Sequence, residues 1–331
     1  MERFALAAAV VLGFALTAAL CSLFVPLRRV LERREQNQQP VQPEQPRPAP
    51  LRAPLWGGLC AAAGTVAAVG VGWLAACVGQ PELLGSEGRL MTRLLTALAG
   101  SLAFGAVGLA EDLARMRSPA ALGLRRDVRL LLEALAAAFV LLLLQAAGCL
   151  PRGLDVPGAG YVLLGSAVPF LWAVLMVALA ECARIAERDE GTVCGAAFVA
   201  MLALMMAEAG LGVPGLAVLP AALAGALVAL LLWAFPPARL GVGCCGSLLA
   251  AGAIGCIPLS LDMTSLTVPL ALPFWAAGGL WAAQLLGAKR TGKPLRCWVK
   301  KHKMSPETVF LCSFALSAVG YVLALALLRW C

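Results

Sequence analysis

The sequence predicts an all-α integral membrane protein, a polytopic helical bundle of about ten spans with both termini external. Three observations carry this prediction. Of the 331 residues, 61% are hydrophobic and 13% are charged, whereas soluble domains average roughly 45–50% apolar and 25% charged residues. The apolar residues come in blocks of about 18 or more, the length that a helix needs to cross a hydrocarbon core of about 30 Å. Most charged residues lie between these blocks.

The spans follow from the apolar blocks in order. The first block runs past the usual apolar length of a signal peptide and shows no small-residue cleavage pattern before Pro26, so we predict an uncleaved span. Residues 36–54, rich in Gln and Pro, are predicted to be an extended cytoplasmic linker within one membrane-embedded domain, 1–331. We expect the spans at residues 4–26, 55–78, 92–110, 128–147, 160–180, 192–209, 213–234, 245–261, 266–288 and 307–329.

The basic residues indicate how the chain is oriented. All but five of the 26 lysines and arginines fall in the loops that follow the odd-numbered spans, the exceptions being Arg3, Arg89, Arg93, Arg152 and Arg329. The positive-inside rule makes those loops cytoplasmic and the termini external in a multi-pass plasma-membrane protein of a bacterial cell. The net charge of +8 thus reflects membrane sidedness, and we expect no nucleic-acid partner.

The cysteines predict no metal framework of a familiar kind. Most of the 12 lie inside apolar blocks, no CxxC pair occurs, and His302 is the only histidine. This pattern argues against a zinc or haem site and favours small buried residues.

The acidic residues form two groups at cytoplasmic span ends. Glu111 and Asp112 lie at the end of the third span, and Glu181, Glu187, Asp189 and Glu190 follow the fifth. Converging carboxylates with arginines nearby would suit a divalent metal that bridges phosphates. Solvated loops that balance their own arginines are the alternative, and charge alone leaves both open.

A family resemblance begins with these acids. Residues 108–115 (GLAEDLAR), followed by Gly123, Leu124 and Arg129, resemble a motif of the polyprenyl-phosphate aminosugar-1-phosphate transferases. That motif has a glycine, an apolar pair, two aspartates and a lysine, then GL and a second lysine. Glu111 and Asp112 stand for the aspartates, and Arg115 and Arg129 stand for the lysines. Within this superfamily the order of features is most similar to that of the phospho-N-acetylmuramoyl-pentapeptide transferases.

Four further segments support the resemblance, in order and on the predicted cytoplasmic face. Residues 54–58 (PLWGG) resemble the family's PxMGG. Residues 181–195 (ECARIAERDEGTVCG) fit the frame of its NxxNLTDGLDGLxxG with different side chains. Glu181 and Arg184 stand on the asparagines, and Glu187 and Glu190 stand on the aspartates. Residues 243–247 (GCCGS) occupy its GDxGS, with Cys244 in the place of the aspartate. Residues 291–293 match its TGK, and His302 falls near its triple histidine.

The resemblance implies a reaction and a set of roles. Family enzymes use Mg²⁺ and an acidic cluster to help a polyprenyl phosphate attack the β-phosphate of a UDP-sugar, which releases UMP. It implies catalytic or metal-binding roles for Glu111, Asp112, Glu187 or Glu190, with Asp112 and Glu187 the first candidates for the metal. It implies phosphate contacts from the basic residues Arg115, Arg129, Arg184, Lys293 or His302.

The departures from the motifs keep several interpretations open. Mg²⁺ prefers oxygen ligands, so Cys244 weakens the expectation of that ion and marks a degenerate motif position. The alternative is that Cys244 is there only because a small residue is needed at the start of a helix. We favour a divergent transferase that acts on a UDP-sugar and undecaprenyl phosphate in peptidoglycan precursor synthesis. The resemblance also implies a homodimer. The alternative is an inactive family member that binds polyprenyl lipid or a protein partner.

A transporter is the third interpretation. It would bury charged residues at mid-membrane, where Glu133 and Glu208 fall. An i,i+4 ion pair with Arg129 explains Glu133 more simply.

Overall fold

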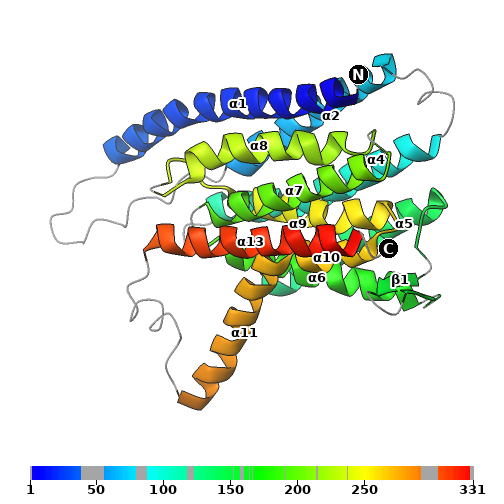
Figure 1. Cartoon of the computed structure of the whole chain (residues 1–331). Coiled ribbons are helices and arrows are strands. Elements are labelled where there is room, and N and C mark those ends of the chain that lie inside the picture. The colour runs from blue at the N-terminus through cyan, green and yellow to red at the C-terminus, as the bar shows by residue number, and fades with distance from the viewer. Residues whose placement is uncertain are drawn as a thin grey trace.

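A computed structural model gives the architecture, a bundle of helices that run roughly parallel to one another except for α11, which leans away from the rest (Figure 1). The structure describes residues 2–38, 56–79, 88–117, 123–151, 153–156, 160–163, 165, 167–189, 191–213, 215–236, 238–291 and 305–328. The elements are α1 (Glu2–Gln38), α2 (Gly57–Gly79), α4 (Gly88–Arg117), α5 (Arg126–Ala146), β1 (Gly153–Val156), β2 (Gly160–Leu163), α6 (Ala167–Ala186), α7 (Thr192–Gly210), α8 (Val218–Ala234), α9 (Gly243–Ser260), the 3₁₀ turn η1 (Thr264–Leu266), α10 (Thr267–Leu270), α11 (Leu272–Thr291) and α13 (Pro306–Leu328).

The all-α membrane fold predicted from the sequence is confirmed. Each predicted span overlaps a helix, and the ninth overlaps the series η1, α10 and α11. Among the described residues, seven helices are long and apolar enough to cross a membrane, and an eighth span results if the pair bent by 61° around residue 271 counts as one. The apolar α8 has 17 residues. The number of about ten spans therefore stays a prediction.

The structure corrects two boundaries. The predicted span 160–180 is wrong at its start, because Gly160–Leu163 pairs with Gly153–Val156 as an antiparallel hairpin and the helix begins only at Ala167. α1 continues to Gln38, so the first three residues of the predicted linker 36–54 are helical, and residues 39–54 lie outside the described part of the chain.

The two ends of the bundle can be told apart by the helix packing. A β-carbon on Gly64 would touch Thr17 and one on Gly72 would touch Ala9, so α1 and α2 are antiparallel. The start of α2 pairs with the segment that precedes α9. The start of α1 and the end of α13 lie together at the other end (Figure 1). That this end is external stays a prediction from charge.

The most buried helix is α9, whose every residue is buried. It is apolar on all sides, as a helix enclosed by others must be, and it contacts α2, α4, α6 and α7. Glycines on its neighbours allow close packing: a β-carbon on Gly108 would collide with the Cys244 carbonyl, and one on Gly58 with the Gly246 backbone nitrogen. Small residues let membrane helices approach closely in this way.

Two hydrogen bonds tie the start of α2 to the segment before α9. The amides of Gly57 and Gly58 donate to the carbonyls of Gly241 and Val242, at 3.2 and 2.9 Å. The first amides of a helix have no partner within the helix, and here a neighbouring segment satisfies them. The glycine pair of residues 54–58 thus has a packing role that fixes where α9 begins.

We predict that Gly108→Ala lowers the thermal stability of the purified protein. The added methyl group has no room against α9, and overpacking of this kind costs about 1–3 kcal/mol. Gly70→Ala is the matched control, because nothing lies within 4 Å of its added β-carbon. The melting temperatures of both variants in detergent test this, and equal values would contradict the packing described.

Candidate functional site

The candidate site is built on the first turn of α9, which is capped by a residue of another helix. The backbone amides of Cys244 and Cys245 donate to the two carboxylate oxygens of Asp112, at 3.0 and 2.9 Å. Val242, which precedes α9, makes no side-chain cap. Asp112 of α4 therefore satisfies amides that the helix cannot satisfy itself, and its negative charge is favourable at a helix start. Gly243 has φ +72°, a conformation in which glycine is the least strained residue.

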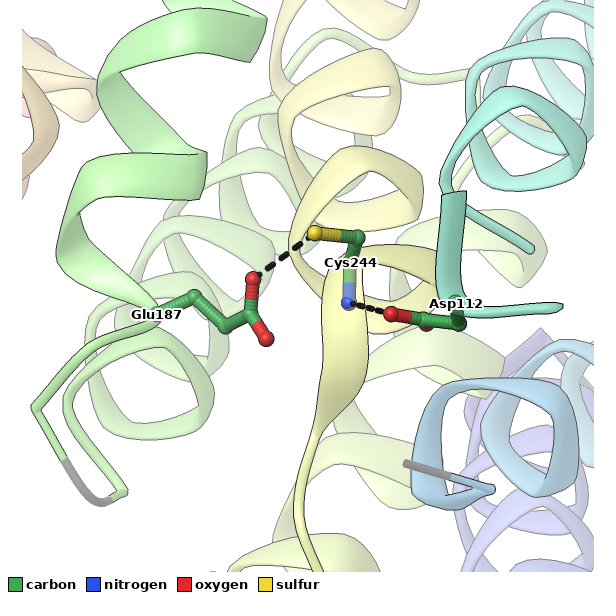
Figure 2. Close-up of side chains that lie close together, drawn as sticks. All are labelled: Asp112, Glu187 and Cys244. Atoms are coloured by element: carbon green, nitrogen blue, oxygen red, sulfur yellow. Dashed lines mark hydrogen bonds between the residues drawn. The ribbon is translucent and has the colours of Figure 1, made fainter. Parts of the chain in front are cut away.

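The thiol of Cys244 lies between the two carboxylates of the cluster (Figure 2). It donates a hydrogen bond to Glu187 Oε2 at 3.0 Å, and Glu187 follows directly on the last residue of α6. One donor atom from each of Asp112, Glu187 and Cys244 lies within 4.8 Å of the others. Three segments that are far apart in the sequence thus place two oxygens and one sulfur together.

Glu187 is the member of this cluster that lies beyond the helices. Its side chain is 11% exposed, compared with 1% for Asp112. Burial raises the pKa of Glu187, while the hydrogen bond from Cys244 and the charge of Arg115 act in the opposite direction. The carboxyl group consequently holds its proton to a higher pH than an exposed glutamic acid does.

Arg115 connects this cluster to Glu111. Its guanidinium lies 2.7 Å from Glu111, 3.8 Å from Glu187 and 3.9 Å from Asp112. With 22% of its side chain exposed, it is the most accessible of the three arginines that form ion pairs with the described acidic residues of this region. Its two longer distances leave hydrogen-bonding capacity for another anionic group.

A second set of ion pairs, centred on Arg129, lies beside the first. Arg129 Nε donates to Glu181 at 2.8 Å, and the guanidinium also lies 3.5 Å from Glu111 and 3.9 Å from Glu133. Arg184 donates to the other oxygen of Glu181 at 2.7 Å. These pairs join α4, α5 and α6, and Glu111 belongs to both sets. The predicted i,i+4 pair of Arg129 and Glu133 is confirmed.

Among the described residues, carboxyl groups outnumber guanidinium groups in this network. The ion pairs link Glu111, Asp112, Glu133, Glu181 and Glu187 to three arginines. Within the described residues, both oxygens of Glu133 and one of Glu111 are buried without a hydrogen-bond partner. Buried charges are costly unless they are paired, so the excess favours bound protons or a bound cation.

The structure brings together most of the site residues predicted from the sequence. Glu111, Asp112, Arg115, Arg129, Arg184 and Glu187 all belong to the connected network, and Cys244 takes part through its thiol. Glu190, Lys293 and His302 lie outside the described residues. Sequence reasoning placed Glu181 in the acidic group after the fifth span but gave it no catalytic, metal-binding or phosphate-binding role. Its spacing of three from Arg184 on one helix was the available signal, because such residues are neighbours on a helix surface.

The donor set does not suit the magnesium ion that the resemblance implies. Mg²⁺ requires oxygen ligands in a near-ideal octahedron, whereas one of the three clustered donors is a thiol. A thiolate selects softer ions. We therefore assign no chemical step to Mg²⁺ at this cluster.

We predict that Asp112→Ala destabilises the protein, because it leaves two buried amides of α9 without acceptors. Hydrogen bonds to a charged group contribute about 1.5–3 kcal/mol each. Asp127→Ala is the control, since Asp127 is exposed in the first turn of α5. Thermal unfolding in detergent compares the two variants. A loss no larger than that of the control would mean that the cap contributes nothing.

We also predict that Arg129→Gln is strongly destabilising, by about 3–5 kcal/mol, because it leaves buried carboxylates unpaired. Arg126→Gln, on an exposed position of the same helix, should have little effect. A double-mutant cycle with Glu181→Gln should give a coupling energy of about 0.5–3 kcal/mol between the two partners. Additive effects would argue against the pairing.

Comparison with known proteins identifies the family of the chain. The sequence model of Glycosyl transferase family 4 matches residues 94–262, which include Asp112, Glu187 and Cys244. The chain is 28% identical over 265 residues to the phospho-N-acetylmuramoyl-pentapeptide-transferase of Mycobacterium tuberculosis (strain ATCC 25618 / H37Rv), covering 72% of each chain. It is 26% identical over 271 residues to the protein of that name from Geobacillus kaustophilus, covering 81% of this chain and 79% of the other. A third, from Desulforudis audaxviator, is 32% identical over 170 residues, 48% of this chain and 50% of the other. The chain therefore belongs to glycosyl transferase family 4 and is similar to its phospho-N-acetylmuramoyl-pentapeptide-transferases.

Proposed function

We propose that this protein is a membrane-embedded phosphotransferase that moves a sugar 1-phosphate from a UDP-sugar to undecaprenyl phosphate. The observation that carries the proposal is the convergence of Asp112, Glu187 and Cys244, donor atoms within 4.8 Å of one another from segments up to 132 positions apart. These are positions at which the family motifs place its acidic residues. The name of the relatives, phospho-N-acetylmuramoyl-pentapeptide-transferase, makes UDP-MurNAc-pentapeptide the first donor to test.

The proposed reaction is an exchange of one phosphoryl bond for another. An oxygen of the lipid phosphate forms a bond to the β-phosphorus of the donor, and the bond from that phosphorus to the bridging oxygen breaks, which releases UMP. Negative charge is spread over phosphate oxygens throughout, so catalysis depends on positioning and on nearby positive charge.

The three arginines divide into two proposed roles. Arg115 is partly exposed and held by one short and two longer ion pairs, so we assign it to the phosphate groups of the donor. Arg129 and Arg184 are held by short hydrogen bonds to Glu181, and we assign them to positioning α5 and α6 around the site. Lys293 and His302 stay candidates for further phosphate contacts.

The exposed apolar surface fits a membrane, in which a lipid substrate would lie. Large apolar side chains are exposed along many helices, among them Leu131, Leu142, Phe170 and Leu323, and such faces are stable only in contact with lipid or another apolar surface. We place the protein in a bacterial inner membrane with its acidic cluster on the cytoplasmic side, where peptidoglycan precursors are made. A homodimer stays a prediction.

Release of UMP is the test. Purified protein with undecaprenyl phosphate, divalent cation and either UDP-MurNAc-pentapeptide or UDP-GlcNAc should release UMP, and Glu187→Gln should lower kcat about 100-fold or more, in the range seen when one electrostatic group is removed from an active site. Glu187 follows the end of α6, so the substitution should leave the melting temperature close to that of the wild type.

Asp189→Asn is the matched control, because Asp189 is exposed two residues away and should retain activity. Equal activity of the two variants would contradict the role given to Glu187.

An inactive family member is the second candidate, favoured by Cys244 in place of an acidic residue and by the internal pairing of Arg129 and Arg184. It predicts no UMP release with either donor from protein that still binds undecaprenyl phosphate. A transporter is less well supported, since Glu133, one of its two candidate buried charges, lies 3.9 Å from Arg129.

A further inference from the structure

The Cys244 thiol lies close to the carboxylates of Asp112 and Glu187, where a metal ligand would lie. It is 0% exposed, its sulfur lies 3.0 Å from Glu187 Oε2, and its own backbone amide is fixed by Asp112. A cysteine serving only as a small residue at a helix start needs no carboxyl partner. Cys245 is the contrast: its amide binds Asp112 in the same way, but its sulfur is not one of the three clustered donors.

The charge around the thiol favours a cation. The connected network holds an excess of two carboxyl groups over guanidinium groups, and Glu111, 2% exposed, has one carboxylate oxygen without a hydrogen-bond partner among the described residues. With Cys244 bound as a thiolate the excess becomes three negative charges, and a divalent ion offsets two of them. An ion coordinated by sulfur and oxygen together is typical of borderline metals, whereas Mg²⁺ and Ca²⁺ take oxygen alone.

We propose that Cys244, Asp112 and Glu187 bind a thiophilic divalent cation of the zinc and cobalt class in place of magnesium. This deepens the proposed function, on which it rests for the position of the substrate. On binding, the S–H bond of Cys244 breaks, the sulfur donates its electron pair to the metal, and the proton leaves to solvent. The absence of CxxC spacing is no obstacle, because the three donors come from separate segments.

Co²⁺ is the probe, because it reports its own ligands by absorption. The full-length protein in detergent, stripped with a chelator, is titrated with Co²⁺, and a thiolate-to-cobalt charge-transfer band is expected at saturation. The band should be lost in Cys244→Ser and kept in Cys245→Ser, the matched control. Excess Zn²⁺ should abolish the band, and Mg²⁺ at the same concentration should not.

Further outcomes separate this inference from the proposed function. A band that survives Cys244→Ser, in protein with an unchanged melting temperature, would place the cobalt on another cysteine and overturn the inference. UMP release supported by Mg²⁺ in a protein that shows no band would overturn the inference and leave the proposed function standing. A Cys244-dependent band without UMP release from either donor would support the metal site and contradict the transferase.

Discussion

The structure depends on one interaction, the capping of α9 by the carboxylate of Asp112. α9 is buried along its whole length, so no water reaches its first amides, and an acceptor must come from a neighbouring helix. Asp112 supplies it twice, at 3.0 and 2.9 Å. Because α9 is held there, Cys244 is brought within 3.0 Å of Glu187. The same carboxylate thus fixes the core helix and aligns the candidate site, and substitutions at Asp112 affect stability and chemistry together.

The departures from the family motifs are coupled to one another in space. Glu181 and Arg184, which stand where the family has two asparagines, form a 2.7 Å ion pair, and Arg129 binds the same glutamate. Glu111 is held by Arg115 in the same way. Among the described residues, each of the exchanged acids Glu111, Glu181 and Glu187 lies no more than 3.8 Å from an arginine, as buried charges require. Cys244 also has a partner, because its thiol donates to the carboxylate of Glu187.

The fold was largely predictable from the sequence, and the site was predictable in part. Apolar blocks located the long helices, because lipid demands long uninterrupted stretches. They did not predict that α1 continues to Gln38 and α4 to Arg117, beyond the predicted ends at residues 26 and 110. They failed at 160–163, where a short apolar run is a strand, since periodicity does not separate the two states over so few residues. The predicted spans and the positive-inside rule placed Asp112, Glu187 and Cys244 on the cytoplasmic side of the membrane. The contact of thiol with carboxylate, and the role of Glu181, depend on how α4, α6 and α9 pack together, which no local pattern encodes.

The central claim is that this chain is a transferase whose cation preference is set by the residue at position 244. The most direct measurement is UMP release by the wild type and by Cys244→Asp, each with Mg²⁺ alone and with Co²⁺ alone. The account predicts that Co²⁺ supports the wild type better than Mg²⁺ does, and that the substitution reverses the order, because a carboxylate replaces the sulfur with the hard donor that Mg²⁺ prefers. The same preference in both proteins, or no release from either, would contradict it.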